Sequence, residues 1–182
     1  REHSEKIVSD GKGGVIIVFE KQISGVWDIW AQRLDSSGNK LWGAGGVAVT
    51  TVAGNRRNHK VQKDRNGGAI VTWQDLRNGS TYDIYAQRLD ANGTLLWGAA
   101  AKPVCMAAGD QINAKIEADS LTNGAYIAWQ DTRTSPDYDI YMQHLDSMGN
   151  PKWTLDGIVI ANQLQNQSAL DMLYSSGGDQ VI

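Results

Sequence analysis

Cysteine and proline are scarce in this sequence, whose 182 residues include one cysteine and three prolines. The lone Cys105 excludes an internal disulfide and leaves the redox compartment undetermined. Long apolar runs are also missing. The longest is residues 15–19 (VIIVF), which has the length of a strand and falls far short of the ~20 residues that a membrane-spanning helix requires. We therefore expect no membrane span.

Charge of one sign is not concentrated anywhere in the chain. There are 17 basic and 20 acidic residues, for a formal net charge of −3, whereas a nucleic-acid-binding protein presents a basic face to the phosphates. No nucleic-acid partner is therefore expected. The catalytic motifs HExxH, CxxC and GxSxG are absent from the sequence. With 41% hydrophobic residues, the composition is that of one ordinary globular domain.

A nine-residue segment occurs three times. Residues 27–35 (WDIWAQRLD) return as residues 82–90 (YDIYAQRLD) and 138–146 (YDIYMQHLD), at offsets of 55 and 56 residues. A period near 50 residues is typical of the four-stranded blades of β-propellers. We therefore divide the sequence into units at residues 1–56, 57–111 and 112–167, followed by the start of a fourth unit at residues 168–182.

Turn-forming residues separate four β-rich runs within a unit. In the second unit these runs are residues 59–63, 68–75, 82–89 and 95–106, the last with an expected bend at Gly98. No segment has the apolar spacing of a capped helix. We therefore predict an all-β fold with four antiparallel strands in each unit.

The third run of each unit indicates how its sheet is covered. In residues 82–89, alternation puts Ile84 on one face and Tyr85 and Leu89 on the other, so both faces carry large apolar groups. Sheets that stack around an axis have this property. Because proline has no amide hydrogen for the ladder, the run that contains Pro103 is expected at a sheet edge. A β-propeller satisfies these observations.

Together, these runs and turns form a recognisable repeat. Residues 73–77 (WQDLR), 82–90 and 96–98 (LWG) resemble β-propeller repeats of large secreted or surface-anchored bacterial proteins. The resemblance covers about residues 6–182. It implies propeller blades and an extracellular or bacterial cell-surface location, and it implies no particular activity.

The number of units leaves open how a ring would close. The 182 residues make about 3.3 units, whereas closed propellers have about 4 to 8 blades. Three explanations remain. The chain is a piece of a longer polypeptide that supplies the remaining blades, its final strands complete a blade with its N-terminal strands, or several copies assemble into one ring.

The aromatic residues fall into two groups. Five tryptophans recur at strand ends or at one position in each unit, and we expect them in the core between neighbouring sheets: Trp42, Trp73, Trp97, Trp129 and Trp153. The repeated segment mixes Trp and Tyr, which indicates a polar boundary, and aromatic rings suit the apolar faces of sugars. Its aromatic positions are the candidate binding residues: Trp27, Trp30, Tyr82, Tyr85, Tyr138 and Tyr141.

Two charged triplets recur in the second and third units: Asp75, Arg77 and Asp83, then Asp131, Arg133 and Asp139. An arginine fork between two carboxylates is expected to lock the loop between the second and third strands. The alternative is a glycosidase pair, in which one carboxyl group holds a proton at neutral pH. Because a nearby arginine favours ionisation of both carboxylates, we expect a structural network and no catalytic residue.

Each unit also contains an Asp-x-x-Gly segment, at residues 35–38, 90–93 and 146–149. We interpret these segments as hairpin turns in which Asp accepts hydrogen bonds from backbone amides and Gly supplies a positive φ. Calcium at these loops is the alternative, although a run of alternating oxygen ligands is missing. No other metal or cofactor is expected. His144 replaces the arginine found at positions 33 and 88, and we expect a partly exposed strand residue.

The function that these observations favour is a non-enzymatic extracellular propeller scaffold or protein-interaction module. Its variable loops would be residues 22–26, 76–81 and 132–137, and its partners another protein or the remaining blades. Carbohydrate binding through exposed aromatic residues is the alternative. A glycoside hydrolase or lyase is the third possibility.

Overall fold

The computed structural model describes residues 2–134, 136–162 and 165–167, and all of its regular elements are strands. The first sheet contains β1 (Glu2–Ser9), β2 (Val15–Ile23), β3 (Val26–Leu34) and β4 (Val47–Ala48). The second contains β5 (Arg56–Lys63), β6 (Ala69–Asp75), β7 (Asp83–Leu89) and β8 (Lys102–Cys105). The third contains β9 (Gln111–Ala118), β10 (Ala125–Asp131), β11 (Asp139–Leu145) and β12 (Ile158–Ala161).

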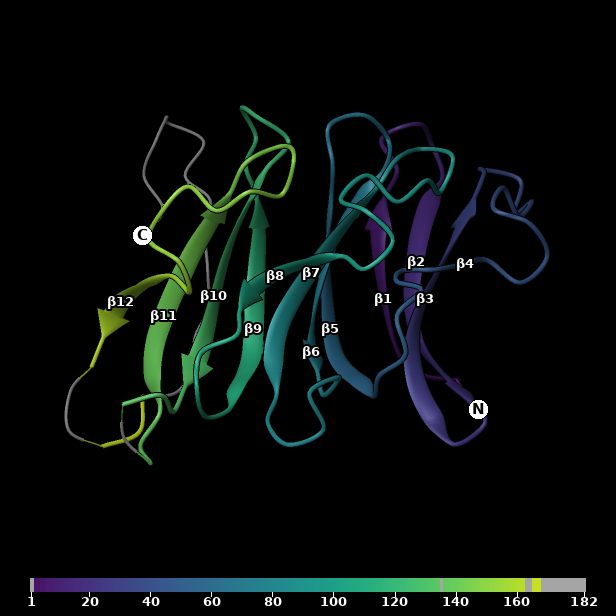
Figure 1. The fold of residues 1–182 in the computed structure, drawn as a ribbon. Helices are drawn as coiled ribbons and strands as arrows, with labels where there is room; N and C mark the ends of the chain where they lie inside the picture. The colour runs from purple at the N-terminus through teal and green to yellow at the C-terminus, as the bar shows by residue number, and fades with distance from the viewer. Residues whose placement is uncertain (1, 135, 163–164, 168–182) are drawn as a thin grey trace.

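All three sheets are antiparallel, and each orders its four strands as they follow in the chain (Figure 1). The register is also shared, because Phe19 pairs with Trp30 in the first sheet and Trp73 pairs with Tyr85 in the second. The predicted all-β fold with four antiparallel strands per unit is confirmed. No sheet closes on itself. The expected start of a fourth unit, residues 168–182, lies outside the described residues.

The predicted fourth strand was too long. Leu95 makes only an isolated bridge to Leu89, and the strand proper is β8. Gly98 and Ala101 both have left-handed φ, at +86° and +63°, and Ala101 N donates to Gly98 O at 3.1 Å. A tight turn therefore interrupts the run. Pro103 lies in β8, at the edge of the second sheet, as expected.

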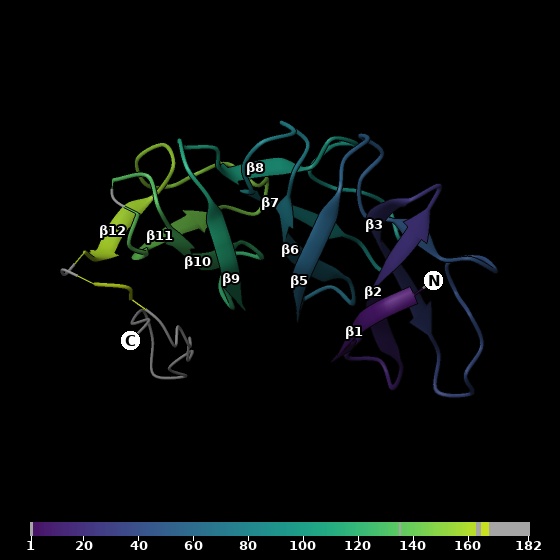
Figure 2. The same cartoon turned by 90° about the horizontal axis from the view of Figure 1, so that it is seen from below.

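Neighbouring sheets pack face to face and share two apolar cores. The first core joins the first and second sheets, and its large members are Ile16, Val18, Trp42, Val71, Trp73 and Leu89. The second core joins the second and third sheets, and its large members are Ile70, Ile84, Trp97, Ile127, Trp129 and Leu145. Seen from below, the three sheets form a curved row (Figure 2). Each sheet therefore covers a face of its neighbour.

Helices are missing from the described part of the chain, so none of its segments is a helix with the length and apolar character needed to cross a membrane. The loop expected at residues 22–26 is also much shorter than predicted. Strands β2 and β3 continue through it to a two-residue turn at Ser24 and Gly25, whose φ angles are +50° and +86°. A two-residue turn with positive φ matches the twist of a hairpin.

Candidate functional site

The first charged triplet lies where β6 and β7 end side by side, with Asp75 opposite Asp83. Asp75 is fully buried. Its Oδ2 accepts hydrogen bonds from Arg77 Nη2 at 2.6 Å and Arg56 Nε at 3.0 Å. Trp73 Nε1 donates to the same oxygen at 2.9 Å. One carboxylate therefore accepts hydrogen bonds from two guanidinium groups. The expected arrangement was the opposite, with one arginine between two carboxylates.

Asp75 also organises the loop that follows β6. Its Oδ1 accepts the backbone N–H of Arg77 at 2.9 Å, and the Arg77 guanidinium lies 3.6 Å from the centre of the Tyr85 ring. Burial opposes the charge of Asp75, but hydrogen bonds from Arg77 and Trp73 and the charge of Arg56 outweigh it and lower the carboxyl pKa. Asp75 is therefore an anion that anchors a loop.

Asp83 behaves in the opposite way. Its side chain accepts a hydrogen bond from Asn78 Nδ2 at 3.2 Å, and the described residues place no cation within ion-pair distance of it. Burial and the nearby charge of Asp75 raise the pKa of Asp83 to about 6. Arg77 lowers the pKa of Asp83, but burial and Asp75 raise it more, because the Arg77 guanidinium donates its hydrogen bond to Asp75.

The raised pKa of Asp83 predicts a stabilising substitution. Folding raises this pKa from 3.8 to about 6, so the ionised side chain destabilises the folded state at pH 7. Asp83→Asn should increase the free energy of unfolding at pH 7 by about 1–2 kcal/mol, less than the full shift because solvent screens the loop. The gain should grow as the pH rises from 3.8 to about 6, the two pKa values, and should vanish well below the lower of them. Urea unfolding of both proteins across this range measures it. A gain that does not depend on pH would contradict the assignment.

The second triplet is built in a similar way at the end of β10. Asp131 is fully buried. It accepts hydrogen bonds from Arg133 Nη2 at 2.6 Å and Trp129 Nε1 at 2.8 Å. Arg133 Nη2 also donates to the carbonyl oxygen of Asp156 at 2.9 Å. Asp139 accepts from Thr134 Oγ1 at 2.6 Å, in the place where Asp83 accepts from Asn78. The second and third sheets therefore anchor their loops with the same kinds of contact.

Two of the six candidate binding aromatics are not available to a ligand. Tyr85 and Tyr141 are only 6% and 8% exposed, because an arginine covers each ring. The guanidinium carbon of Arg133 lies 3.8 Å from the centre of the Tyr141 ring, as Arg77 does at Tyr85. Each ring therefore packs against the arginine of the loop that follows β6 or β10.

The other four candidates are half-buried: Trp27, Trp30, Tyr82 and Tyr138. Trp30 lies under Lys21, whose Nζ is 4.2 Å from the ring centre. The backbone N–H of Tyr82 donates to Asp110 Oδ1 at 2.9 Å, and that of Tyr138 donates to Asn166 Oδ1 at 2.9 Å. These four are therefore the more exposed of the six aromatics.

Four of the five expected core tryptophans are buried: Trp42, Trp73, Trp97 and Trp129 are 0–5% exposed. Trp153 differs, because it is half-buried on the outer face of the third sheet. Its ring lies beside Tyr126 and His144, at centroid distances of 6.1 Å and 6.0 Å. No described sheet covers that face as the second and third sheets cover Trp42 and Trp97.

A buried ion pair missed by sequence reasoning recurs in the first two sheets. Asp10 accepts from Arg33 Nε and Nη2 at 2.9 Å and 2.8 Å. Asp64 accepts from Arg88 in the same bidentate way, at 3.1 Å and 3.0 Å. The other oxygen of each Asp accepts backbone amides of the turn after it, as Asp64 Oδ1 does from Gly68 N at 2.6 Å. The signal was available, since aspartates 10, 64 and 119 follow the repeat period.

The third sheet replaces this pair with histidine. His144 Nε2 lies 3.0 Å from Asp119 Oδ2, and the His144 ring stacks on Tyr126 at 4.1 Å. His144 is half-buried. It is therefore a partly exposed strand residue, as expected, and it also takes the place of the paired arginine.

The Asp-x-x-Gly segments are hairpin turns, as predicted. Asp35 Oδ1 accepts the backbone N–H groups of Ser37 and Asn39 at 2.8 Å and 2.9 Å. Gly38 has a φ of +82°. The turns at residues 90–93 and 146–149 repeat this arrangement. Within the described ranges, no group of three or more His, Cys, Asp or Glu side chains is placed to hold a metal ion.

The junctions between sheets use these turns. Trp42 Nε1 and Arg33 Nη1 both donate to the carbonyl oxygen of Ala91 in the next sheet's turn, at 3.0 Å and 2.8 Å. Trp97 Nε1 and Arg88 Nη1 likewise donate to Ser147 O, at 3.0 Å and 3.3 Å. The arginine of each buried pair therefore also joins its sheet to the next.

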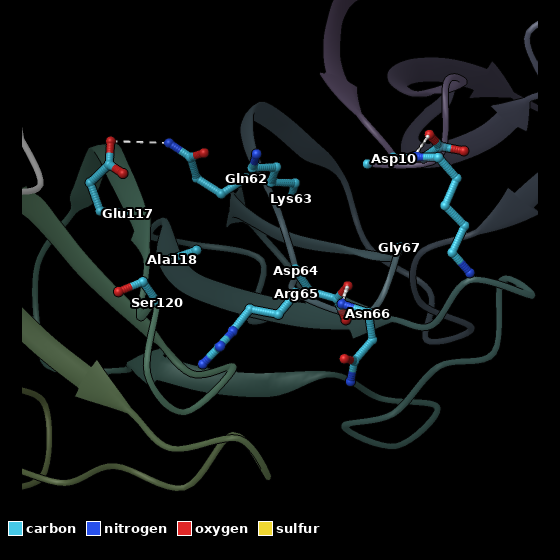
Figure 3. A pocket seen from close by; sticks show the side chains of 12 residues that line it. Asp10, Gln62, Lys63, Asp64, Arg65, Asn66, Gly67, Glu117, Ala118 and Ser120 are labelled. Atoms are coloured by element: carbon cyan, nitrogen blue, oxygen red, sulfur yellow. Dashed lines mark hydrogen bonds between the residues drawn. The ribbon is translucent and has the colours of Figure 1, made fainter. Parts of the chain in front are cut away.

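A hollow of about 680 Å³ lies beside the β1–β2 and β5–β6 turns and the end of β9 (Figure 3). Lys12 and Arg65 supply positive charge on its rim, while Asp10 and Asp64 are already bound to the turn amides and the paired arginines. Arg65 Nη1 donates to Leu121 O at 2.9 Å across the second junction. Asp10 and Asp64 are therefore structural, and the third carboxylate of the hollow, Glu117, accepts a hydrogen bond from Gln62 Nε2 at 3.0 Å.

The fold and its charged groups are therefore known from the sequence and structure of this chain. No family model matches the sequence, and no curated protein or solved structure matches it either.

Proposed function

We propose that this chain is a segment of an extracellular β-propeller and acts as a non-catalytic scaffold that presents loops to a protein partner. One observation carries the proposal. The charged residues that repeat, Asp75 and Asp131, are fully buried and hold the loops that follow them. The loop tips at residues 78–81 and 134–137 differ in sequence. A fixed frame with variable tips is how a scaffold accommodates a partner.

The curved row of sheets supports the propeller part of the proposal. Sheets with the same strand order pack face to face through the same tryptophan and arginine contacts at both junctions (Figure 2). Radial packing of four-stranded antiparallel sheets defines a propeller. The extracellular location rests on the resemblance of residues 73–98 to repeats of secreted and surface proteins.

An exchange of loop tips tests the scaffold. Residues 78–81 (NGST) are replaced by TSPD, the residues of 134–137, which keeps the length and retains a donor for Asp83. The free energy of unfolding should change by less than about 1 kcal/mol, as for surface substitutions elsewhere. A secreted protein that cross-links to the native chain, identified by mass spectrometry, should no longer cross-link to the exchanged one. A destabilised variant, or no partner that depends on the loop, would overturn the proposal.

Carbohydrate binding has one observation in its favour, because Trp27, Tyr82 and Tyr138 are half-exposed at the same place in each sheet. A glycan array and a titration that follows tryptophan fluorescence distinguish the two functions. The scaffold predicts no saturable change with any sugar. Saturable binding that Trp27→Ala removes would favour the lectin.

A glycoside hydrolase is the least supported function, despite the separated pKa values of Asp75 and Asp83. These side chains are 0% and 4% exposed, so a sugar cannot reach them. Glycan hydrolysis that Asp75→Asn abolishes in a folded protein would restore this function.

A further inference from the structure

The first strand of each sheet has the same local distortion, followed by a lysine. Ser4, Asn58 and Asn113, in β1, β5 and β9, have left-handed φ values of +54°, +55° and +56°. At these points the pairing with the second strand shifts register, which marks a β-bulge. Bulges redirect the side chains next to them. The residue two positions later is a lysine in all three sheets: Lys6, Lys60 and Lys115.

The three first strands lie on the concave side of the curved row of sheets (Figure 2). Strand β5 contacts both β1 and β9, and Asn58 Nδ2 donates to Asn113 Oδ1 at 3.0 Å, so two of the bulges touch. A hollow of about 200 Å³ lies beside these strands, and all three lysines line it. Lysines from three different sheets therefore meet at one place, which we call the lysine hollow.

The lysine hollow has an excess of positive charge. Burial lowers the pKa of the Lys60 amino group, and the charges of the two other lysines lower it further, whereas the charge of Glu20 raises it. All ion pairs printed by the geometry of the described residues use arginine or histidine as the cation, so none involves these lysines. The carboxylate that lines the hollow is Glu117, which accepts a hydrogen bond from Gln62 Nε2 at 3.0 Å. Three cations therefore face one anion.

Lysines on an edge strand have a simpler use, because they prevent the edge from pairing with another chain. Lysines of that kind extend into water, where their charges are hydrated and screened. Lys6 is exposed in this way, but Lys60 and Lys115 are half-buried. Burial of like charges beside one another costs free energy, and an anion bound between them would offset that cost. The repeated lysines therefore fit a binding site better than a solvated edge.

We infer that the lysine hollow binds a sulfate or phosphate group. An ammonium group is a compact point charge that suits a tetrahedral oxyanion, whereas a planar carboxylate is matched better by the fork of an arginine. Lys60 Nζ donates to Asn58 Oδ1 at 2.8 Å and to His59 O at 3.4 Å, which positions the amino group and leaves its third hydrogen for the ligand. The volume of about 200 Å³ is far above the about 10–15 Å³ that holds one water molecule.

The oxyanion has two sources, a free inorganic ion or a group carried on a polymer such as a sulfated polysaccharide. The lysine hollow adjoins the hollow of about 680 Å³, because Gln62 and Glu117 line both (Figure 3). Lys12, Lys63 and Arg65 add positive charge to the larger hollow. A polymer would therefore reach these further cations, whereas a free ion would contact the three lysines alone.

Calorimetric titration with inorganic phosphate at constant ionic strength tests the site. The native chain should bind phosphate saturably, and Lys60→Gln should weaken binding by about 10-fold or more, as for the loss of one charge-assisted hydrogen bond. Lys102→Gln is the matched control, because Lys102 is also a half-buried lysine of the second sheet but lies in β8, at the opposite edge. It should bind phosphate as the native chain does. Equal affinities of the two variants would overturn the proposal.

A native chain that binds no phosphate would also overturn it. The sequence carries Asp171 one repeat after Lys115, and a carboxylate of the chain itself that neutralised the lysines would give this negative result. The titration therefore decides between a ligand and an internal counter-charge.

Thermal unfolding separates binding from a structural role of Lys60. Without phosphate, Lys60→Gln should unfold at the native temperature or above it, because the substitution removes a repelled charge. Phosphate should raise the unfolding temperature of the native chain and have much less effect on the variant. Lys115→Gln removes a second lysine of the hollow from another sheet and should behave in the same way. Stabilisation of both variants by phosphate to the native extent would contradict the site.

Sulfated and neutral dextran distinguish the two sources. If the anion is carried on a polymer, sulfated dextran should bind more tightly than inorganic sulfate, and Lys63→Gln should weaken the binding of the polymer alone. Equal binding of both sulfates, unaffected by Lys63→Gln, would assign a free ion. Equal binding of neutral dextran would refute the anion site. Binding here depends on Lys60 and should survive Trp27→Ala, unlike that of the lectin, and it leaves the loop tips unchanged, so the scaffold function can fail while the site stands.

Discussion

Trp97→Ala is expected to lower the free energy of unfolding by about 3–5 kcal/mol, the usual cost of truncating a fully packed aromatic side chain. Trp97 is 3% exposed between the second and third sheets. Its ring rests on Gly149 and its Nε1 donates to Ser147 O at 3.0 Å. The substitution therefore removes apolar packing and leaves a buried carbonyl short of one donor.

Trp153→Ala is the matched control, because it changes the same residue type at the same place in the third sheet. Trp153 is half-buried, so its loss should cost about 1 kcal/mol. Urea unfolding followed by circular dichroism measures both variants. The chain concentration is kept low, so that association contributes nothing to the measured stability. Equal losses in the two variants would show that Trp97 is not packed between sheets.

The parts of the fold that depend on neighbouring residues in the chain were predictable. The Asp-x-x-Gly turns are local, since Asp35 bonds to amides two and four residues along. Strand alternation is also local, and it marked both faces of β7 as apolar before any contact was known. Pro103 was placed at an edge because a missing N–H is a property of the residue itself.

Partners from distant parts of the chain were not predictable. Arg56 reaches Asp75, 19 residues away, and Asp28 of the preceding sheet, at 2.8 Å. A periodic pattern shows that a charge recurs, but it does not show which of several opposite charges it meets. The expected fork at Asp83 has this origin, because both carboxylates were assigned to Arg77 on sequence proximity alone.

For the buried arginines, the repeat period predicts which positions recur but not which aspartate each arginine contacts. Arg33 and Arg88 stand out in the repeat, yet their aspartates lie two strands earlier and pair with them only once the sheets form. The histidine at position 144 is explained only by the structure, which places its Nε2 3.0 Å from Asp119 Oδ2.

Arg88→Met should destabilise the protein by about 3–5 kcal/mol, because it leaves a buried carboxylate without its cation. The side chains of Arg88 and Asp64 are 8% and 0% exposed, and methionine matches the length of the arginine stem without its charge. The same change removes the Arg88 contact with Ser147 across the junction. Urea unfolding at neutral pH measures the loss.

Two further variants decide whether the ion pair is the cause. Asp64→Asn combined with Arg88→Met removes both charges, so it should cost clearly less than the sum of the single substitutions. Arg88→His copies the pair that the third sheet already uses, His144 with Asp119 at 3.0 Å, and should cost less than Arg88→Met. Additive losses would mean that Asp64 and Arg88 stabilise the fold independently, through the turn amides and the junction. A coupling of several kcal/mol would show that the ion pair between Asp64 and Arg88 is a main source of the stability of its sheet. The Arg88 guanidinium connects three parts of the protein, because it lies on β7 and bonds both to Asp64 in a turn and to Ser147 O of the neighbouring sheet.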